Sequence, residues 1–84
     1  MRDIVKVIDA VLSEIPDETM REQMRERLRP VKSAATRGYF CPEAQSGHWI
    51  EAQRTIQCFL PWPPVEPWQE RIADIWSGRT EVGR

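Results

Sequence analysis

The sequence predicts an all-α fold, a small compact bundle of about four helices joined by short proline-rich connectors. Apolar residues recur every three or four positions in several separate stretches, which is the spacing of one helical face. Prolines and capping residues fall between those stretches, and no alternation of period two is long enough for a sheet. The 84 residues suffice for one domain. We therefore expect residues 1–78 to form a single helical domain and residues 79–84 a polar C-terminal tail.

The first helix is expected from Asp3 to Ile15. Its apolar stripe consists of Ile4, Ile8, Val11, Leu12 and Ile15. Asp3 has a side chain that suits the N-cap, because a carboxylate oxygen can accept a hydrogen bond from a free amide of the first turn. Pro16 ends the helix, since proline lacks an amide donor and disfavours helical geometry in the residue before it.

A second helix is expected after Asp17, which caps it. Its apolar stripe consists of Met20, Met24, Leu28 and Val31. Pro30 predicts a break or kink near Arg29, followed by a short continuation from Pro30 to Thr36 with proline in its first turn. Gly38 suits the left-handed stop after that continuation.

The third helical stretch has two interpretations. In one, Pro42 to Gln45 form a single turn, and Ser46 caps a separate helix that runs to Phe59 or Leu60. In the other, one helix runs from Pro42 through Gly47 at a local cost of about 1 kcal/mol for the glycine.

Four prolines shape the connector that follows, which reads Pro61-Trp62-Pro63-Pro64-Val65-Glu66-Pro67. They exclude helix or central strand and favour extended geometry. Pro67 suits the first turn of a last helix, which Ser77-Gly78 ends. The apolar face of that helix consists of Trp68, Ile72, Ile75 and Trp76.

Composition and the N-terminal residues predict a cytoplasmic protein without membrane association. Hydrophobic residues make up 40% and charged residues 30%, and no apolar run approaches the roughly 20 residues that cross a bilayer. The acidic Asp3, Asp9 and Glu14 are unlike a secretory signal. In a reducing compartment, Cys41 and Cys58 are expected to be free, partly buried thiols.

No catalytic or metal site stands out, so we predict a non-enzymatic protein that needs no cofactor or metal. His48 is the single histidine, and Cys58 lies ten residues away, about 15 Å along a helix axis. A zinc site built from Cys41, His48, Cys58 and Glu51 would lack the closely spaced ligand pairs of structural zinc sites. The isolated glycines form no phosphate-binding loop.

Charge is unevenly distributed along the chain. Residues 1–20 carry −3, residues 21–37 carry +4, and the remainder carries −2. The basic stripe consists of Arg21, Arg25, Arg29 and Lys32. Such a stripe can contact a phosphate backbone. We favour an ion-paired solvent face, because glutamates stand three residues before the arginines in Glu18–Arg21, Glu22–Arg25 and Glu26–Arg29.

The four tryptophans divide into two groups. Trp49, Trp68 and Trp76 occupy apolar helix faces and are expected in the core. Trp62 stands between prolines, so no helix directs it inward. It either packs over the helix ends as a lid, which we favour, or is exposed as an anchor for a partner, as in interface hot spots.

By elimination, the sequence indicates a protein-binding module, an inhibitor or adaptor of a larger protein or protein complex. The candidate partner-binding residues are Arg21, Arg25, Arg29, Lys32 and Trp62. In overall type, though not in any motif, the chain is similar to the small inhibitors that phages make against host complexes, anti-CRISPR proteins included. The alternative is a small DNA-binding regulator that uses the basic residues 21–37, with nucleic acid not favoured. The sequence does not decide whether the chain forms a homodimer.

Overall fold

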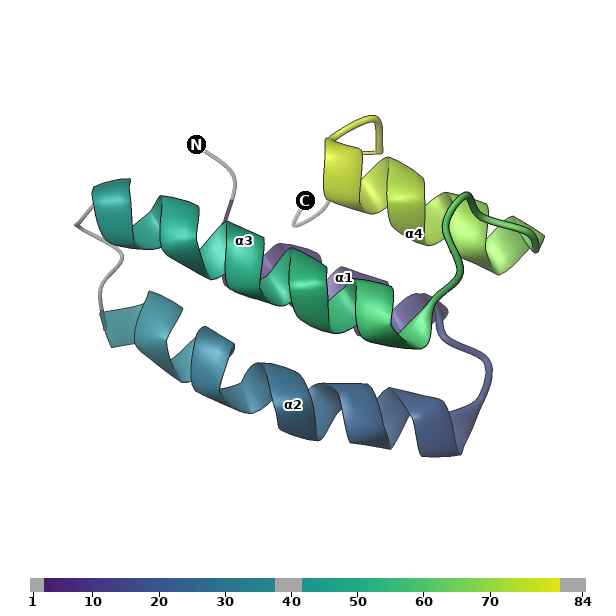
Figure 1. Ribbon diagram of the computed structural model, residues 1–84, viewed down its shortest axis with the longest axis horizontal. Coiled ribbons are helices and arrows are strands. Elements are labelled where there is room, and N and C mark those ends of the chain that lie inside the picture. The colour runs from purple at the N-terminus through teal and green to yellow at the C-terminus, as the bar shows by residue number, and fades with distance from the viewer. Residues whose placement is uncertain (1–2, 38–41, 81–84) are drawn as a thin grey trace.

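Four helices make up the part of the chain described by a computed structural model, residues 3–37 and 42–80, and they confirm the predicted all-α bundle (Figure 1). The helices are α1 (Ile4–Glu14), α2 (Glu18–Arg37), α3 (Pro42–Phe59) and α4 (Pro67–Ser77). No strand occurs in these two ranges. The radius of gyration is 12.3 Å, close to the roughly 12 Å expected of one compact domain of this length.

Helix α1 is central, because it contacts each of the other three helices, while α2 also packs along α3. The predicted N-cap is confirmed: Asp3 Oδ1 accepts a hydrogen bond from the Val5 amide at 3.0 Å. The helix ends at Glu14, one residue before the predicted end, where the Ile15 amide turns back to the Leu12 carbonyl at 3.2 Å. Pro16 follows in the connector, as expected.

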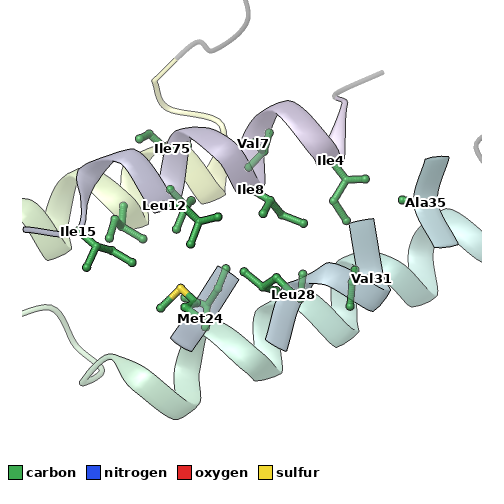
Figure 2. Close-up of a cluster of buried hydrophobic side chains, with 14 residues drawn as sticks. Ile4, Val7, Ile8, Leu12, Ile15, Met24, Leu28, Val31, Ala35 and Ile75 are labelled. Carbon is green, nitrogen blue, oxygen red and sulfur yellow. The ribbon is translucent and has the colours of Figure 1, made fainter. Parts of the chain in front are cut away.

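The core lies between α1 and α2 and extends to α3 and α4 (Figure 2). It consists of Ile4, Val7, Ile8, Val11, Leu12, Ile15, Met24, Leu28, Val31, Ala35, Ala52, Ile56, Ile72 and Ile75. In Figure 2 the side chains of Ile4, Ile8 and Ile15 of α1 face α2, from which Met24, Leu28 and Val31 point back. Burying an aliphatic side chain of this size contributes about 1.5–3 kcal/mol, so the two apolar stripes account for why these helices pair.

Helix α2 runs without interruption through Pro30, so a break near Arg29 is wrong, and the alternative of a kink stays a prediction. Val31 and Ala35, beyond the proline, are buried on the same face as Met24 and Leu28, before it. Ending the helix at Arg29 would remove those two side chains from the core. Because Pro30 itself is exposed, water can reach the backbone carbonyl that its missing amide leaves without a partner.

Helix α3 is likewise continuous, from Pro42 through Gly47 to Phe59. This confirms the single-helix interpretation, and the separate helix capped by Ser46 is wrong. A Cβ at Gly47 would meet nothing within 4 Å, so neither packing nor backbone geometry requires glycine there. The expected connector 39–41 and the expected stop at Gly38 lie outside the described residues.

Helix α4 begins and ends as the sequence predicts. Pro67 occupies its first turn, and the Gln69 side chain accepts hydrogen bonds from the Val65 and Glu66 amides at 2.8 and 3.0 Å. Gly78 ends the helix in the left-handed region, with φ 87°. The first residues of the expected tail fold back, since the Arg79 and Thr80 amides both donate to the Asp74 carbonyl. The domain boundary at residue 78 stays a prediction.

Candidate partner-binding surface

The connector between α3 and α4 exposes Trp62, with Pro61 before it and Pro63 and Pro64 after it. Trp62 is 70% exposed, so the favoured expectation that it packs as a lid is wrong, and the alternative of an exposed side chain holds. Three residues further along, Val65 is 75% exposed. The connector therefore presents two large apolar side chains to solvent on a segment that prolines make stiff.

The connector joins the C-terminal end of α3 to the N-terminal end of α4 (Figure 1), and the backbones of these two helices do not pack closely. Helix α4 packs against α1, whereas no Cα atom of α3 comes within 8 Å of one in α4. The tryptophans Trp49 and Trp76 bridge the two helices, with ring centroids 5.0 Å apart and an angle of 64° between the rings. An aromatic edge-to-face contact thus takes the place of close helix packing.

Residues of α3, α4 and the connector line a small cavity of about 40 Å³, which we call the apolar hollow. Its lining consists of Ile56, Gln57, Leu60, Pro61, Trp62, Pro64, Gln69, Ile72, Ala73 and Trp76. Two glutamines are the polar members of that set, and the rest are apolar side chains. Trp62 is thus both a largely exposed side chain of the connector and one wall of the hollow.

The other tryptophans lie at the edge of the core. Trp49, Trp68 and Trp76 are half-buried and pack against the buried cluster, which agrees with the predicted core position. The indole of Trp68 also donates a hydrogen bond to Glu66, just before α4.

The basic stripe of α2 is engaged in contacts within the chain. Arg25 pairs with Glu22, and Arg29 Nη2 lies 2.6 Å from Glu26 Oε1, which confirms two of the three pairs expected at this spacing. Lys32 Nζ reaches Asp9 Oδ1 of α1 at 2.6 Å.

Arg21 makes a different contact from the one expected. Its Nη1 donates to the Ile15 carbonyl at 3.2 Å, so it binds the C-terminal end of α1 instead of pairing with Glu18. A cation at a helix C-terminus is favourable, because the last carbonyls carry partial negative charge.

A shallow, open depression of about 330 Å³ lies along the basic stripe. Its lining consists of Arg25, Arg29, Lys32, Ser33 and Thr36. Three cations face it, but each already has a carboxylate partner. This is the arrangement that an ion-paired solvent face would have.

The groups weighed for catalysis or metal binding are not brought together. Cys58 is free, but it is exposed, so the expected partial burial is wrong; Cys41 lies outside the described residues. Nε2 of His48 is buried and without a hydrogen-bond partner. Within residues 3–37 and 42–80, no three His, Cys, Asp or Glu side chains gather as metal ligands. No helix there combines the length and apolar character needed to cross a membrane.

Three features of this surface escape sequence reasoning. The exposure of Val65 and the hollow itself both depend on how α3 and α4 are placed, and no local pattern reports that placement. A long-range ion pair joins Arg71 Nε to Glu14 Oε2 at 2.8 Å and links α4 to α1.

Comparison with protein-family models, curated proteins and solved structures finds no match for the chain.

Proposed function

We propose that this chain is a small non-enzymatic protein-binding module, an inhibitor or adaptor that docks onto a larger protein or protein complex. The main support for the proposal is the exposure of Trp62, whose side chain is 70% exposed between prolines. Tryptophan is among the residues most enriched at interface hot spots. A side chain on a stiff connector also loses little conformational freedom on binding, which favours affinity.

The contacts of the basic stripe favour this proposal over the alternative of a DNA-binding regulator. Phosphates would have to displace Glu22, Glu26 and Asp9 from the cations they already contact. In the proposed module, Arg21, Arg25, Arg29 and Lys32 are peripheral contacts that keep their bonds within the chain, a role in which charge affects rate and specificity more than affinity.

A phage inhibitor of host machinery, such as an anti-CRISPR protein, is the specific form of the proposal that we favour. Its support is the separation of charge, +4 in residues 21–37 against −3 in residues 1–20. Separated charge helps to steer a small protein toward a charged target.

The test compares wild type with Trp62→Ala and with Ile50→Ala in capture from lysate of the host. Ile50 is a matched control, because it is also a large exposed apolar side chain and lies nine residues before the end of α3, roughly 13 Å along the helix from Phe59. We expect wild type and Ile50→Ala to retain one discrete protein complex. Truncating a hot-spot tryptophan costs about 2 kcal/mol or more, a loss of about 30-fold in affinity, so Trp62→Ala should lose the complex.

The charge variant Arg25→Glu/Arg29→Glu separates the two functions. Recovery of nuclease-sensitive nucleic acid that is lost in this variant and kept in Trp62→Ala would replace the proposal with the DNA-binding alternative. That binding would also fall steeply with salt concentration, since phosphate contacts release counterions.

A further inference from the structure

Helix α4 is held in the bundle by a surface that every copy of the chain carries. Its backbone packs closely on α1 alone. Ile72 and Ile75 of α4 are buried in the cluster that α1 shares. Arg71 Nε also lies 2.8 Å from Oε2 of Glu14, at the end of α1. The α1 surface of a second copy therefore offers α4 the same apolar contacts and the same ion pair.

The segment that connects α3 to α4, residues 60–66, contains three prolines, and the chain reverses its direction there (Figure 1). Proline-rich segments favour the extended polyproline geometry, in which seven residues span about 20 Å. That reach is close to the two shorter dimensions of the domain, 25 and 22 Å. An extended connector therefore carries α4 away from its own α1 and within reach of α1 in a neighbouring copy.

The backbone hydrogen bonds at the two ends of this connector belong to the flanking helices. The Leu60 amide donates to the Ile56 carbonyl of α3 at 3.1 Å. The Val65 and Glu66 amides donate to the Gln69 side chain of α4. The three prolines between them have no amide hydrogen to donate. Extending the connector between Leu60 and Val65 thus leaves all three of these hydrogen bonds in place.

We infer that two copies of the chain exchange α4, so that α4 of each copy packs on α1 of the other and extended connectors join the two halves. A released α4 needs such a surface, because Ile72 and Ile75 are apolar and would otherwise face water. Exchange restores their burial and forms the Arg71–Glu14 pair between the two chains. A second copy is the occupant whose fit the structure itself displays, since α4 already packs on an α1 of the same sequence.

The inference does not depend on the proposed protein-binding function, but it has a consequence for it. Trp62 lies in the connector and forms one wall of the apolar hollow. Extending the connector removes Trp62 from that wall. The exchanged dimer therefore presents a different surface to a partner protein than the closed chain does.

The test reverses charge at the ion pair that exchange moves from within one chain to between two chains. Glu14→Arg and Arg71→Glu each bring like charges together, both in the closed chain and in a dimer of one variant. In a dimer with one copy of each variant, exchange brings opposite charges together at both contacts between α1 and α4. Equal amounts of the two variants are mixed, warmed and cooled, and native mass spectrometry measures the mixed dimer and the two homodimers.

Asp74→Arg and Arg79→Glu are the matched control. Arg79 Nε lies 2.9 Å from Asp74 Oδ1, and this pair stays within one chain, because both residues move with α4. Exchange therefore gives their mixed dimer no advantage. Circular dichroism checks that each variant stays folded.

Without a charge preference, the mixed dimer is as abundant as the two homodimers together. For Glu14→Arg with Arg71→Glu we expect it to exceed them about tenfold, because two exposed pairs change from like to opposite charge and each is worth a few-fold. For the control mixture we expect equal abundance. Equal abundance in both mixtures would overturn the inference, because it would show that the copies associate side by side without exchanging α4.

Wild type and connector variants supply a second measurement, light scattering as a function of concentration. A short connector closes on itself with an effective concentration in the millimolar range, so the dimer of wild type should appear between about 0.1 and 1 mM. Replacing Pro61, Pro63 and Pro64 together by glycine should weaken dimerisation about fivefold, because a flexible connector reverses more readily. Pro16→Gly, in the exposed connector between α1 and α2, should change it less than about twofold. A wild type that stays monomeric up to about 1 mM, or a glycine connector that leaves dimerisation unchanged, would show that the inference is wrong.

Discussion

Replacing Pro30 by alanine tests whether α2 is continuous at the position where the sequence predicts a break. Pro30 lies inside α2 and is exposed, so the change removes no core packing. Alanine supplies an amide for the Glu26 carbonyl four residues earlier. A proline in a helix interior is about 3 kcal/mol less favourable than alanine. It also restricts the unfolded chain, an offset of about 0.4–1 kcal/mol, so Pro30→Ala should raise the free energy of unfolding by about 2 kcal/mol.

Thermal and urea denaturation followed by circular dichroism measure the effect. For a domain of this size, 1 kcal/mol corresponds to about 4–8 °C, so Tm should rise by about 8–16 °C. Pro67→Ala is the matched control, because proline in the first turn of α4 leaves no hydrogen bond unmade. It should leave stability unchanged or lower it by up to about 1 kcal/mol. An unchanged or lowered Tm in Pro30→Ala would refute the reasoning, since a helix interrupted at Pro30 gains nothing from the added amide.

Four further predictions follow, three of which are measured as changes in the free energy of unfolding and the fourth as the reaction rate of a thiol. Leu28→Ala should lower the free energy of unfolding by about 3 kcal/mol, because Leu28 is completely buried between α1 and α2; a loss below about 1 kcal/mol would contradict the packing. Asp17→Ala should cost about 1 kcal/mol, because Asp17 Oδ1 accepts from the first free amides of α2, at 2.9 and 3.2 Å; Asp17→Asn should restore most of it. A double-mutant cycle on Asp9 and Lys32 should give a coupling below about 1 kcal/mol, as for other solvent-exposed ion pairs. Cys58 should react with a thiol reagent in the folded protein nearly as fast as in urea, whereas a slow reaction would show that it is buried.

The helices could be predicted from the sequence because each is determined by signals within itself. Asp3 and Asp17 are followed by apolar residues at helical spacing, and Gly78 has the conformation that ends a helix. The pairs of Arg25 with Glu22 and of Arg29 with Glu26 were equally local, since a helix alone brings residues three apart together.

The wrong predictions involve residues whose state depends on the rest of the fold. Pro30 is tolerated because the buried side chains before and after it pack α2 against α1. Helix propensities describe single residues and do not include the free energy of this packing. Arg21 finds the end of α1 instead of Glu18 because the two helices meet there. Trp62 stays 70% exposed although it forms one wall of the hollow between α3 and α4, and its exposure depends on how those two helices are placed.

The attachment of α4 has a consequence for how the chain opens. Its backbone packs closely on α1 alone, while the Arg71–Glu14 ion pair and the aromatic contact with α3 are made by side chains. Elements with few close neighbours open at the lowest free energy. We therefore expect α4 to detach from the rest of the described chain at a lower free energy than α1, α2 or α3. Such an opening takes apart the wall that Ile72 and Ala73 give the hollow. A bound segment that holds α4 in place would therefore slow amide exchange throughout that helix, because exchange through this opening would proceed only from the unbound fraction of the chain.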